Sequence, residues 1–252
     1  GIGTLASRLM IEGPIVKDKA SFIVSGRRSY ADVFTPLFTD QQNKVFFHDL
    51  NAKVNWKVKN NNRFFAAFYA GRDSFSFDDT FGFSWGNATG TFRWNHLFSD
   101  RLFSNMTLIA SNFDYKLELK DPVQGFKWTS NLRQLSLNND LGFYINPSNE
   151  LTFGYHVSYR EFQPGIISPN AAGSVFLEVS IPRQYVFEND LYVDNQQRIG
   201  EKITLMYGAR LSIFQNIGPA DVTTYADPQN NVRIIRTGTL HYDRFEPVKT
   251  YI

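Results

Sequence analysis

The 252 residues include four histidines and no cysteine, so the histidines are the first candidates for acid–base catalysis. Cysteine nucleophiles, thiolate metal ligands and disulfides are therefore excluded. His48 and His96 fall among apolar residues, where a histidine could take the proton of a neighbouring nucleophile that attacks a lipid ester. Neither has a recognisable nucleophile beside it. An interfacial position explains both histidines, and we expect no catalytic site and no enzyme activity.

Acidic side chains offer a second kind of chemistry. Asp73 and the pair Asp78 and Asp79 could supply carboxylate oxygens to calcium. They lack the spacing of a calcium loop, in which ligands alternate along the chain and a glycine allows the sharp turn. We therefore expect a solvated loop here, and we predict no metal site and no cofactor.

Charged and aromatic residues are candidates for a third role, which is the binding of a substrate. Each candidate ends a segment of alternating polarity that borders a long polar connection. Aromatic rings there could stack on a ligand, and charged groups could bind an anion or a sugar. Salt bridges, headgroup contacts and a belt of interfacial aromatic residues are the competing explanations. The candidate substrate-binding residues are Arg27, Tyr30, Asp73, Trp85 and Trp128.

The composition narrows the class of protein. The formal net charge of +2 gives no reason to expect a nucleic-acid partner. Aromatic residues make up 16% of the chain, although its mean hydropathy is −0.31. No run approaches the roughly 18 consecutive apolar residues of a membrane-spanning helix, and no signal peptide opens the chain. Many aromatic residues in an otherwise polar chain need another explanation.

Alternation of polarity supplies that explanation. Between Val45 and Val58, every second residue is mostly apolar and the intervening residues are polar or charged. Strand side chains alternate between two faces, so this segment predicts a strand with one apolar and one polar face. Its 14 residues exceed the usual strand length of about five or six. The pattern recurs along the chain, and we predict about ten long strands.

The predicted connections alternate in length. The short ones are rich in turn-forming residues and cover Pro14–Lys19, Lys59–Asn62, Ser99–Arg101, Asn146–Glu150 and Arg198–Lys202. The long ones cover Ala31–Asn43, Ser74–Ser84, Asp114–Lys127, Gln163–Pro182 and Gln215–Asp243. Turns on one edge and loops on the other are typical of an outer-membrane β-barrel. A soluble sandwich has no reason to sort its loops in this way.

Two further sets of residues fit a barrel. Aromatic residues near the short turns would form a girdle at the membrane interface, namely Trp56, Phe64, Trp94, Phe98, Phe143 and Phe153. Polar-face residues would line the lumen, and we predict this position for Asp49, Lys53, Arg93, Asp140, Arg160 and Arg210. Opposite charges there would pair with each other or with a plug. The predicted fold class is all-β, an antiparallel up-and-down transmembrane barrel.

The sequence also resembles a known family. GIGTLASRLMIEGPIVKDKASFIVSGRRSYADVF looks like the early barrel strands of TonB-dependent receptors of the Bacteroidetes that carry a carboxypeptidase-regulatory-like domain. VFFHDLNAKVNWKVKNNNRFF, FYAGRDSF, GFSWGNATGTFRWNHLFSDRLFSN and YGARLSIFQNIGP follow in order at similar spacings. Each motif alone is weak, since alternating strands look alike, but their succession covers nearly the whole chain.

This resemblance implies energised uptake of a nutrient across the bacterial outer membrane. Such receptors have barrels of about 22 strands that are closed by a plug, and the plug contacts TonB. About ten strands are half of that barrel, so residues 1–252 are expected to be barrel wall only, without plug or signal peptide. The implied partners are outer-membrane lipid, the TonB complex through the plug, and a SusD-like surface lipoprotein. The alternatives are a complete small barrel, either pore or lipid-acting enzyme, and a soluble all-β binding module.

Overall fold

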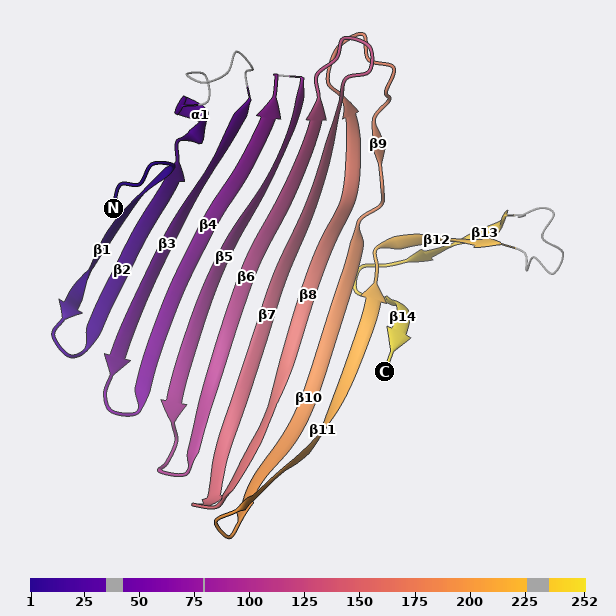
Figure 1. Cartoon of the computed structure of the whole chain (residues 1–252). Coiled ribbons are helices and arrows are strands. Elements are labelled where there is room, and N and C mark those ends of the chain that lie inside the picture. Colours follow the sequence, from indigo (N-terminus) through magenta and orange to yellow (C-terminus); the bar gives the residue numbers. More distant parts are fainter. Residues whose placement is uncertain (35–42, 79, 226–235) are drawn as a thin grey trace.

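The computed structural model describes residues 1–34, 43–78, 80–225 and 236–252. Within them a single antiparallel sheet dominates (Figure 1), and ten of its strands are 10 to 21 residues long. These long strands are β1 (Ala6–Val16), β2 (Ala20–Ser29), β3 (Lys44–Val58), β4 (Asn62–Phe77), β5 (Phe81–Leu97), β6 (Leu102–Leu119), β7 (Phe126–Asn146), β8 (Asn149–Pro169), β10 (Gln184–Ile199) and β11 (Ile203–Ile217).

Shorter elements complete the described chain. They are α1 (Ala31–Phe34), β9 (Val179–Ser180), β12 (Ala220–Tyr225), β13 (Arg236–Tyr242) and β14 (Pro247–Tyr251). None of the helical residues in the described ranges belongs to a helix long and apolar enough to cross a membrane.

The sheet is an open meander. Its strand order is β1-β2-β3-β4-β5-β6-β7-β8-β10-β11-β14, with β9 paired to β8, and the pairs are antiparallel. In the described chain β1 pairs only with β2, and β14 pairs only with β11. The hairpin β12–β13 forms a separate two-stranded sheet that projects sideways (Figure 1). The predicted all-β, up-and-down arrangement of long strands is confirmed.

One face of the sheet is apolar, as β3 and β4 show. Leu50, Ala52, Val54 and Trp56 on β3 lie opposite Ala70, Phe68, Ala66 and Phe64 on β4. Cross-strand partners project to the same face, so these eight side chains form one continuous band. The alternation between Val45 and Val58 therefore becomes one apolar and one polar face of β3.

The apolar face has no partner in the described chain. Of the described residues, only Ala20 and Ile217 are buried hydrophobic residues. By contrast, Leu50, Phe68 and Leu135 are 44%, 44% and 51% exposed. A continuous exposed apolar surface of this kind marks contact with a protein or a membrane.

Aromatic residues close the apolar band at its short-turn end. Trp56, Phe64 and Trp94 are successive register partners on β3, β4 and β5. The rings of Phe64 and Trp94 stack with centroids 6.1 Å apart. A row of aromatic rings at this height is the expected girdle at the membrane interface.

Charged and polar residues close the same band at its other end. His48, Arg72, Gly86 and Asp114 are successive register partners on β3 to β6, one step beyond the row that includes Leu50, Ala70 and Ala88. A guanidinium and a carboxylate need water or headgroups rather than hydrocarbon. The strands thus continue beyond the apolar band at their long-loop ends.

This continuation corrects one predicted loop. Ser74–Ser84 was expected to be a long connection, but β4 runs to Phe77 and β5 begins at Phe81, with residue 79 outside the described residues. The reason is that Phe75, Phe77, Phe81 and Phe83 project to the polar face. The apolar alternation therefore changes face, although the backbone ladder continues.

Other long connections are shorter than predicted for the same reason. Only six residues separate β6 from β7, and β8 extends to Pro169. The connection Gln215–Asp243 contains β12 and β13, while residues 35–42 and 226–235 lie outside the described residues. The five predicted short turns all lie at the lower edge of the sheet (Figure 1), as the sequence predicted. The turn between β4 and β5, at the upper edge, is also short, so only part of the predicted difference between the two edges is present.

Candidate functional site

The polar face of the sheet carries the predicted lumen residues. The strand registers place Asp49, Lys53, Arg93, Asp140, Arg160 and Arg210 on one face, opposite to the apolar band. Several open hollows lie on this face, and one of them has a volume of about 570 Å³. Any solute or polypeptide held by the sheet would meet this face.

Salt bridges neutralise part of its charge, and ring contacts hold some of its cations in place. Arg27 on β2 forms an ion pair of 2.7 Å with Asp49 on β3, and Asp49 is only 10% exposed. The Arg27 guanidinium also lies 4.7 Å from the centre of the Phe47 ring. Arg93 donates a hydrogen bond of 3.2 Å from Nε to Thr107 Oγ1. Arg27, a predicted binding residue, therefore already has a carboxylate partner.

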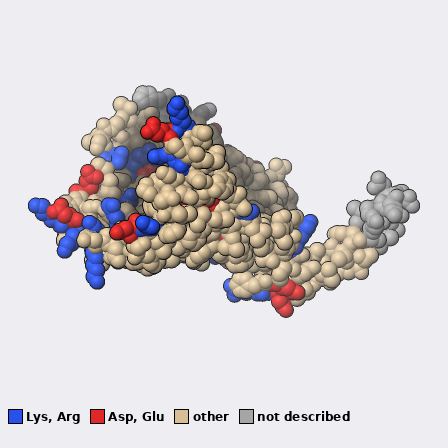
Figure 2. Space-filling model, turned by 90° about the horizontal axis from the view of Figure 1, so that it is seen from below, with Lys and Arg blue, Asp and Glu red and all other residues tan. Residues whose placement is uncertain are grey.

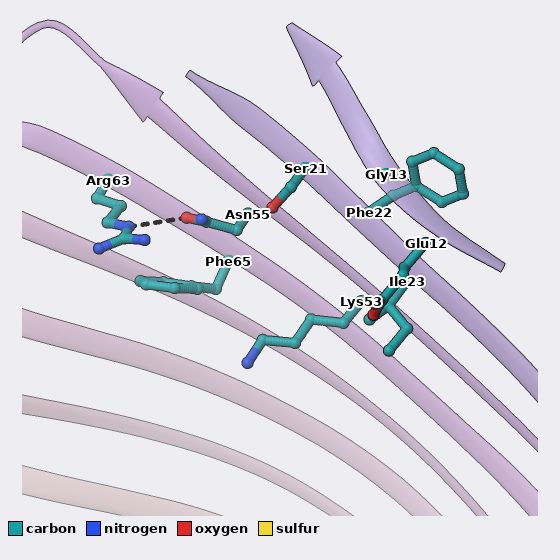
Figure 3. A pocket seen from close by; sticks show the side chains of 9 residues that line it. All are labelled: Glu12, Gly13, Ser21, Phe22, Ile23, Lys53, Asn55, Arg63 and Phe65. Atoms are coloured by element: carbon teal, nitrogen blue, oxygen red, sulfur yellow. Dashed lines mark hydrogen bonds between the residues drawn. The ribbon is translucent and has the colours of Figure 1, made fainter. Parts of the chain in front are cut away.

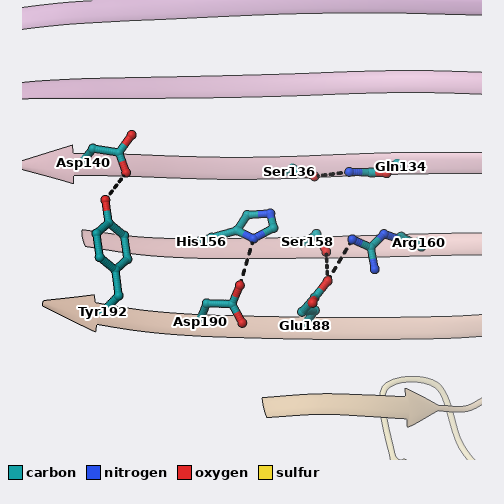
Figure 4. Close-up of polar contacts among 9 residues, drawn as sticks. All are labelled: Gln134, Ser136, Asp140, His156, Ser158, Arg160, Glu188, Asp190 and Tyr192. Atoms are coloured by element: carbon teal, nitrogen blue, oxygen red, sulfur yellow. Dashed lines mark hydrogen bonds and ion pairs between the residues drawn. The ribbon is translucent and has the colours of Figure 1, made fainter. Parts of the chain in front are cut away.

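A denser network joins β7, β8 and β10 (Figure 4). Arg160 forms an ion pair of 2.8 Å with Glu188, and Ser158 Oγ donates to the same carboxylate at 3.3 Å. His156 Nδ1 lies 3.2 Å from Asp190 Oδ2. Ser158 is fully buried beneath these groups. The predicted pairing of opposite charges on this face is present, and His156 belongs to a hydrogen-bond network.

Two side-chain contacts join strands that are not neighbours, and each crosses a glycine on the strand between them. Tyr192 on β10 donates to Asp140 on β7 across Gly154 on β8, its register partner. On the other face, Arg72 on β4 reaches Asp114 on β6 across Gly86 on β5, at 2.7 Å. A Cβ atom at Gly86 would lie 2.7 Å from Arg72 Nη2. Both contacts therefore need a residue without a side chain on the middle strand.

An aromatic stack stands on the polar face at the long-loop end. Phe75 and Phe83 stack with centroids 4.7 Å apart and planes 5° from parallel. Trp85 lies 5.6 Å from Phe75 and 5.4 Å from Phe83. Asp73 is the register partner of Trp85. This arrangement presents ring faces and a carboxylate side by side.

The predicted binding residues do not form one site. Asp73 and Trp85 are neighbours, and Trp128 shares their face but stands on β7, opposite Leu117. The Trp128 ring packs over Gly165, where a Cβ atom would meet it. The Tyr30 hydroxyl donates to the Gly3 carbonyl oxygen, which holds it at the corner beside β1.

The sequence interpretation missed Phe75 and Phe83. The signal was present, because phenylalanine alternates with serine or glycine on both sides of the turn at Asp78 to Thr80. Alternation of this kind around a short turn predicts a hairpin.

Neither a hydrolytic nor a metal site is found in the part of the chain that the structure describes. His96 Nδ1 lies 2.8 Å from Asn62 Oδ1, an amide oxygen and not a nucleophile. The His48 ring stacks on Phe46. No group of three or more histidine or acidic side chains could hold a metal ion in the described ranges, and Asp79 lies outside them.

Two exposed groups outside the long strands, one acidic and one basic, have shifted pKa values. Hydrogen bonds from the backbone N–H groups of Gln124 and Val123 lower the pKa of the Asp121 carboxyl below its usual value. In the β12–β13 hairpin, the hydrogen bond and charge of Asp221 raise the pKa of His241.

The raised pKa of His241 leads to a testable prediction. Protonated His241 favours the paired hairpin, so this contribution is present at low pH and is lost as the pH rises through the raised pKa. Replacing Asp221 with asparagine is expected to lower the pKa of His241 toward its ordinary value of 6.5. A pH titration of the imidazole proton signals by NMR checks this. Asp243→Asn, which removes a carboxylate 3.7 Å from Nε2, should have a smaller effect, and equal effects would contradict the assignment.

Comparison with known proteins identifies the fold. No model of a protein family matches the sequence, and no curated protein matches it. Among solved structures, the chain is similar to the copper transporter OprC, with a TM-score of 0.65 and 10% identity over 98% of this chain and 41% of that one. It is also similar to BauA, the ferric preacinetobactin receptor of Acinetobacter baumannii, with a TM-score of 0.62 and 12% identity over 93% and 41%.

A third similar structure is the ferric-catecholate import receptor Fiu of E. coli K12 in its open form. The TM-score is 0.61 and the identity 12%, over 98% of this chain and 48% of that one. The chain thus spans less than half the length of each of these proteins. At such low identity the likeness concerns the fold: the described chain has the fold of a section of a TonB-dependent receptor barrel.

Proposed function

We propose that this chain forms part of the barrel wall of a TonB-dependent receptor that takes up a nutrient across the bacterial outer membrane. The observation that carries the proposal is the two-faced sheet, with an exposed apolar band outside and a paired polar network inside. Its open edges support further strands beyond β1 and β14, because unpaired backbone groups are prohibitive in lipid. The complete barrel would have about 22 strands and enclose a plug.

The proposed role is transport and not catalysis. The partners are outer-membrane lipid around the apolar band and the TonB complex, through a plug outside this chain. The Bacteroidetes branch and a SusD-like lipoprotein stay predictions of the sequence resemblance, without support from the structure. The three similar structures carry copper and iron chelates by name, so these solutes are the first probes.

Uptake by cells that express the parent protein tests this function. We would measure accumulation of copper and of ferric catecholates with TonB present and with TonB deleted. Accumulation that requires both the protein and TonB supports the proposal. A parent protein found outside the outer-membrane fraction, or with an intact mass near 29.0 kDa, would contradict it, because neither leaves room for a plugged barrel.

Within this function, the aromatic stack is the proposed place of substrate contact on this chain. Phe75, Phe83 and Trp85 present half-buried rings beside Asp73 at the long-loop end, where a solute would arrive. Trp128 extends the same face by two strands. Arg27 and Tyr30 are proposed to support the wall, since each already has a partner.

Removing one ring tests this placement. Trp85→Ala is expected to weaken binding of the transported solute by about two- to tenfold, because an aromatic contact contributes roughly 0.5–1.5 kcal/mol beyond its buried area. Equilibrium binding to the purified protein measures the change. The matched control is Trp56→Ala on the opposite face, where Trp56 is 54% exposed. An unchanged affinity for Trp85→Ala, or an equal loss for both variants, would remove the stack from the site.

A further inference from the structure

The polar face is not evenly charged, and its basic side lies over the short turns of β1 to β4. Seen from that end, several basic side chains, with acidic ones among them, lie on the side of the molecule where these strands lie (Figure 2). Three adjoining hollows lie there. Arg63 lines all three, and Ser21, Asn55, Lys57 and Phe65 each line two of them. Together their walls include four basic side chains, Lys19, Lys53, Lys57 and Arg63, and two acidic ones, Glu12 and Asp18. We name this surface the basic hollow.

Neighbouring side chains hold the cations of the basic hollow in place (Figure 3). Arg63 Nε donates to Asn55 Oδ1 at 2.8 Å, and its guanidinium lies 5.0 Å from the centre of the Phe65 ring. Lys53 Nζ lies 5.8 Å from the same ring. One phenyl ring thus attracts two cations, which projects both positive charges into the hollow without neutralising them.

These cations have no carboxylate partner. In the part of the chain that the structure describes, Lys53, Lys57 and Arg63 take part in no ion pair. On the same face at β8 and β10, by contrast, Arg160 pairs with Glu188. The described wall therefore pairs Arg160 with a carboxylate on β10, and it leaves the cations of the basic hollow without one.

We propose that the basic hollow docks an acidic segment of polypeptide inside the barrel, and this rests on the proposed function, which places a plug there. Lys53 and Lys57 are four residues apart on β3, about 13 Å at roughly 3.3 Å per residue. A small anion could contact Lys57 together with its register partner Arg63, but it could not reach Lys53 as well, whereas aspartates and glutamates spaced along a segment can contact all three. The hollow also lies at the opposite end of the strands from the aromatic stack, which separates it from the proposed place of substrate contact.

Zero-length crosslinking tests the proposal on the full-length protein. A carbodiimide joins a lysine amine to a carboxylate in contact with it, as an amide with loss of water. We expect mass spectrometry of tryptic peptides to show Lys53 or Lys57 joined to aspartate or glutamate outside residues 1–252. The yield should fall severalfold at about 1 M salt, where the Debye length is roughly 3 Å. Lys116, paired with Glu118, is the internal positive control.

Charge removal supplies a second readout. Lys53→Gln combined with Arg63→Gln is expected to speed protease cleavage of the crosslinked segment in the folded protein. Lys202→Gln, which removes a charge at another short turn, should leave the cleavage rate unchanged. Crosslinks only to Glu12, to lipid or to a separate protein would overturn the proposal. A parent protein several times heavier than this chain, in which Lys53 and Lys57 form no crosslink, would also overturn it. These results do not depend on uptake, so the loss of this docking site would leave the transport proposal standing.

Discussion

Replacing Ala52 with arginine is expected to lower the free energy of unfolding of the membrane-inserted protein by about 2–4 kcal/mol. Ala52 lies in the middle of the apolar band of β3, with Val24 and Phe68 as its register partners. An arginine there must either lose its hydration in hydrocarbon or bend toward the headgroups. Urea titration of the protein folded into phospholipid vesicles measures the change.

The adjacent residue supplies the control. Asn51 projects to the polar face and is exposed there, next to Tyr69 and on the same face as Asp49. Asn51→Arg adds the same group one residue away, where it stays hydrated and can approach the Asp49 carboxylate. We expect a change of less than about 1 kcal/mol, the range of surface ion pairs. Equal losses for the two variants would show that the apolar face does not contact lipid.

The fold was predictable from alternation because one face of each strand meets a uniform environment. Under the proposed function, lipid selects apolar side chains at Leu50, Ala52 and Val54 whatever stands on the neighbouring strands. The prediction failed between Ser74 and Ser84. There the strands rise above the apolar band, and the aromatic residues change to the polar face. Beyond the membrane no single environment sets the pattern, while backbone hydrogen bonds continue the strands.

The site was less predictable because it depends on register. Asp73 and Trp85 were both candidates, but only the pairing of β4 with β5 shows that they are neighbours. Tyr192 and Asp140 are 52 residues apart, and their contact depends on a third strand. The residue types alone could identify charged side chains on the polar face, but they could not show which of these charges were already paired. Arg27 is the example, since its carboxylate partner is 22 residues away.

The contact of Tyr192 with Asp140 makes Gly154 a sensitive position on the polar face. Its backbone has no left-handed φ, so glycine is required there by space and not by conformation. A Cβ atom would overlap the backbone oxygen of Asn139 and lie 3.0 Å from the Tyr192 hydroxyl. Gly154→Val should therefore both crowd β7 and displace the ring of Tyr192. Overpacking of this kind costs about 1–3 kcal/mol, and a lost hydrogen bond to a carboxylate adds roughly 1.5–3 kcal/mol.

Two comparisons separate these effects. Gly90→Val places the same side chain on the apolar face of β5, where no atom lies within 4 Å of the added Cβ, and it should be neutral in urea titration. Tyr192→Phe should destabilise the wild-type protein but cost much less in the Gly154→Val background, because the bond it removes is already broken. If Tyr192→Phe costs the same in both backgrounds, the hydrogen bond does not depend on Gly154. If Gly90→Val is as damaging as Gly154→Val, the sheet requires glycine for its backbone and not for the side chain that crosses it.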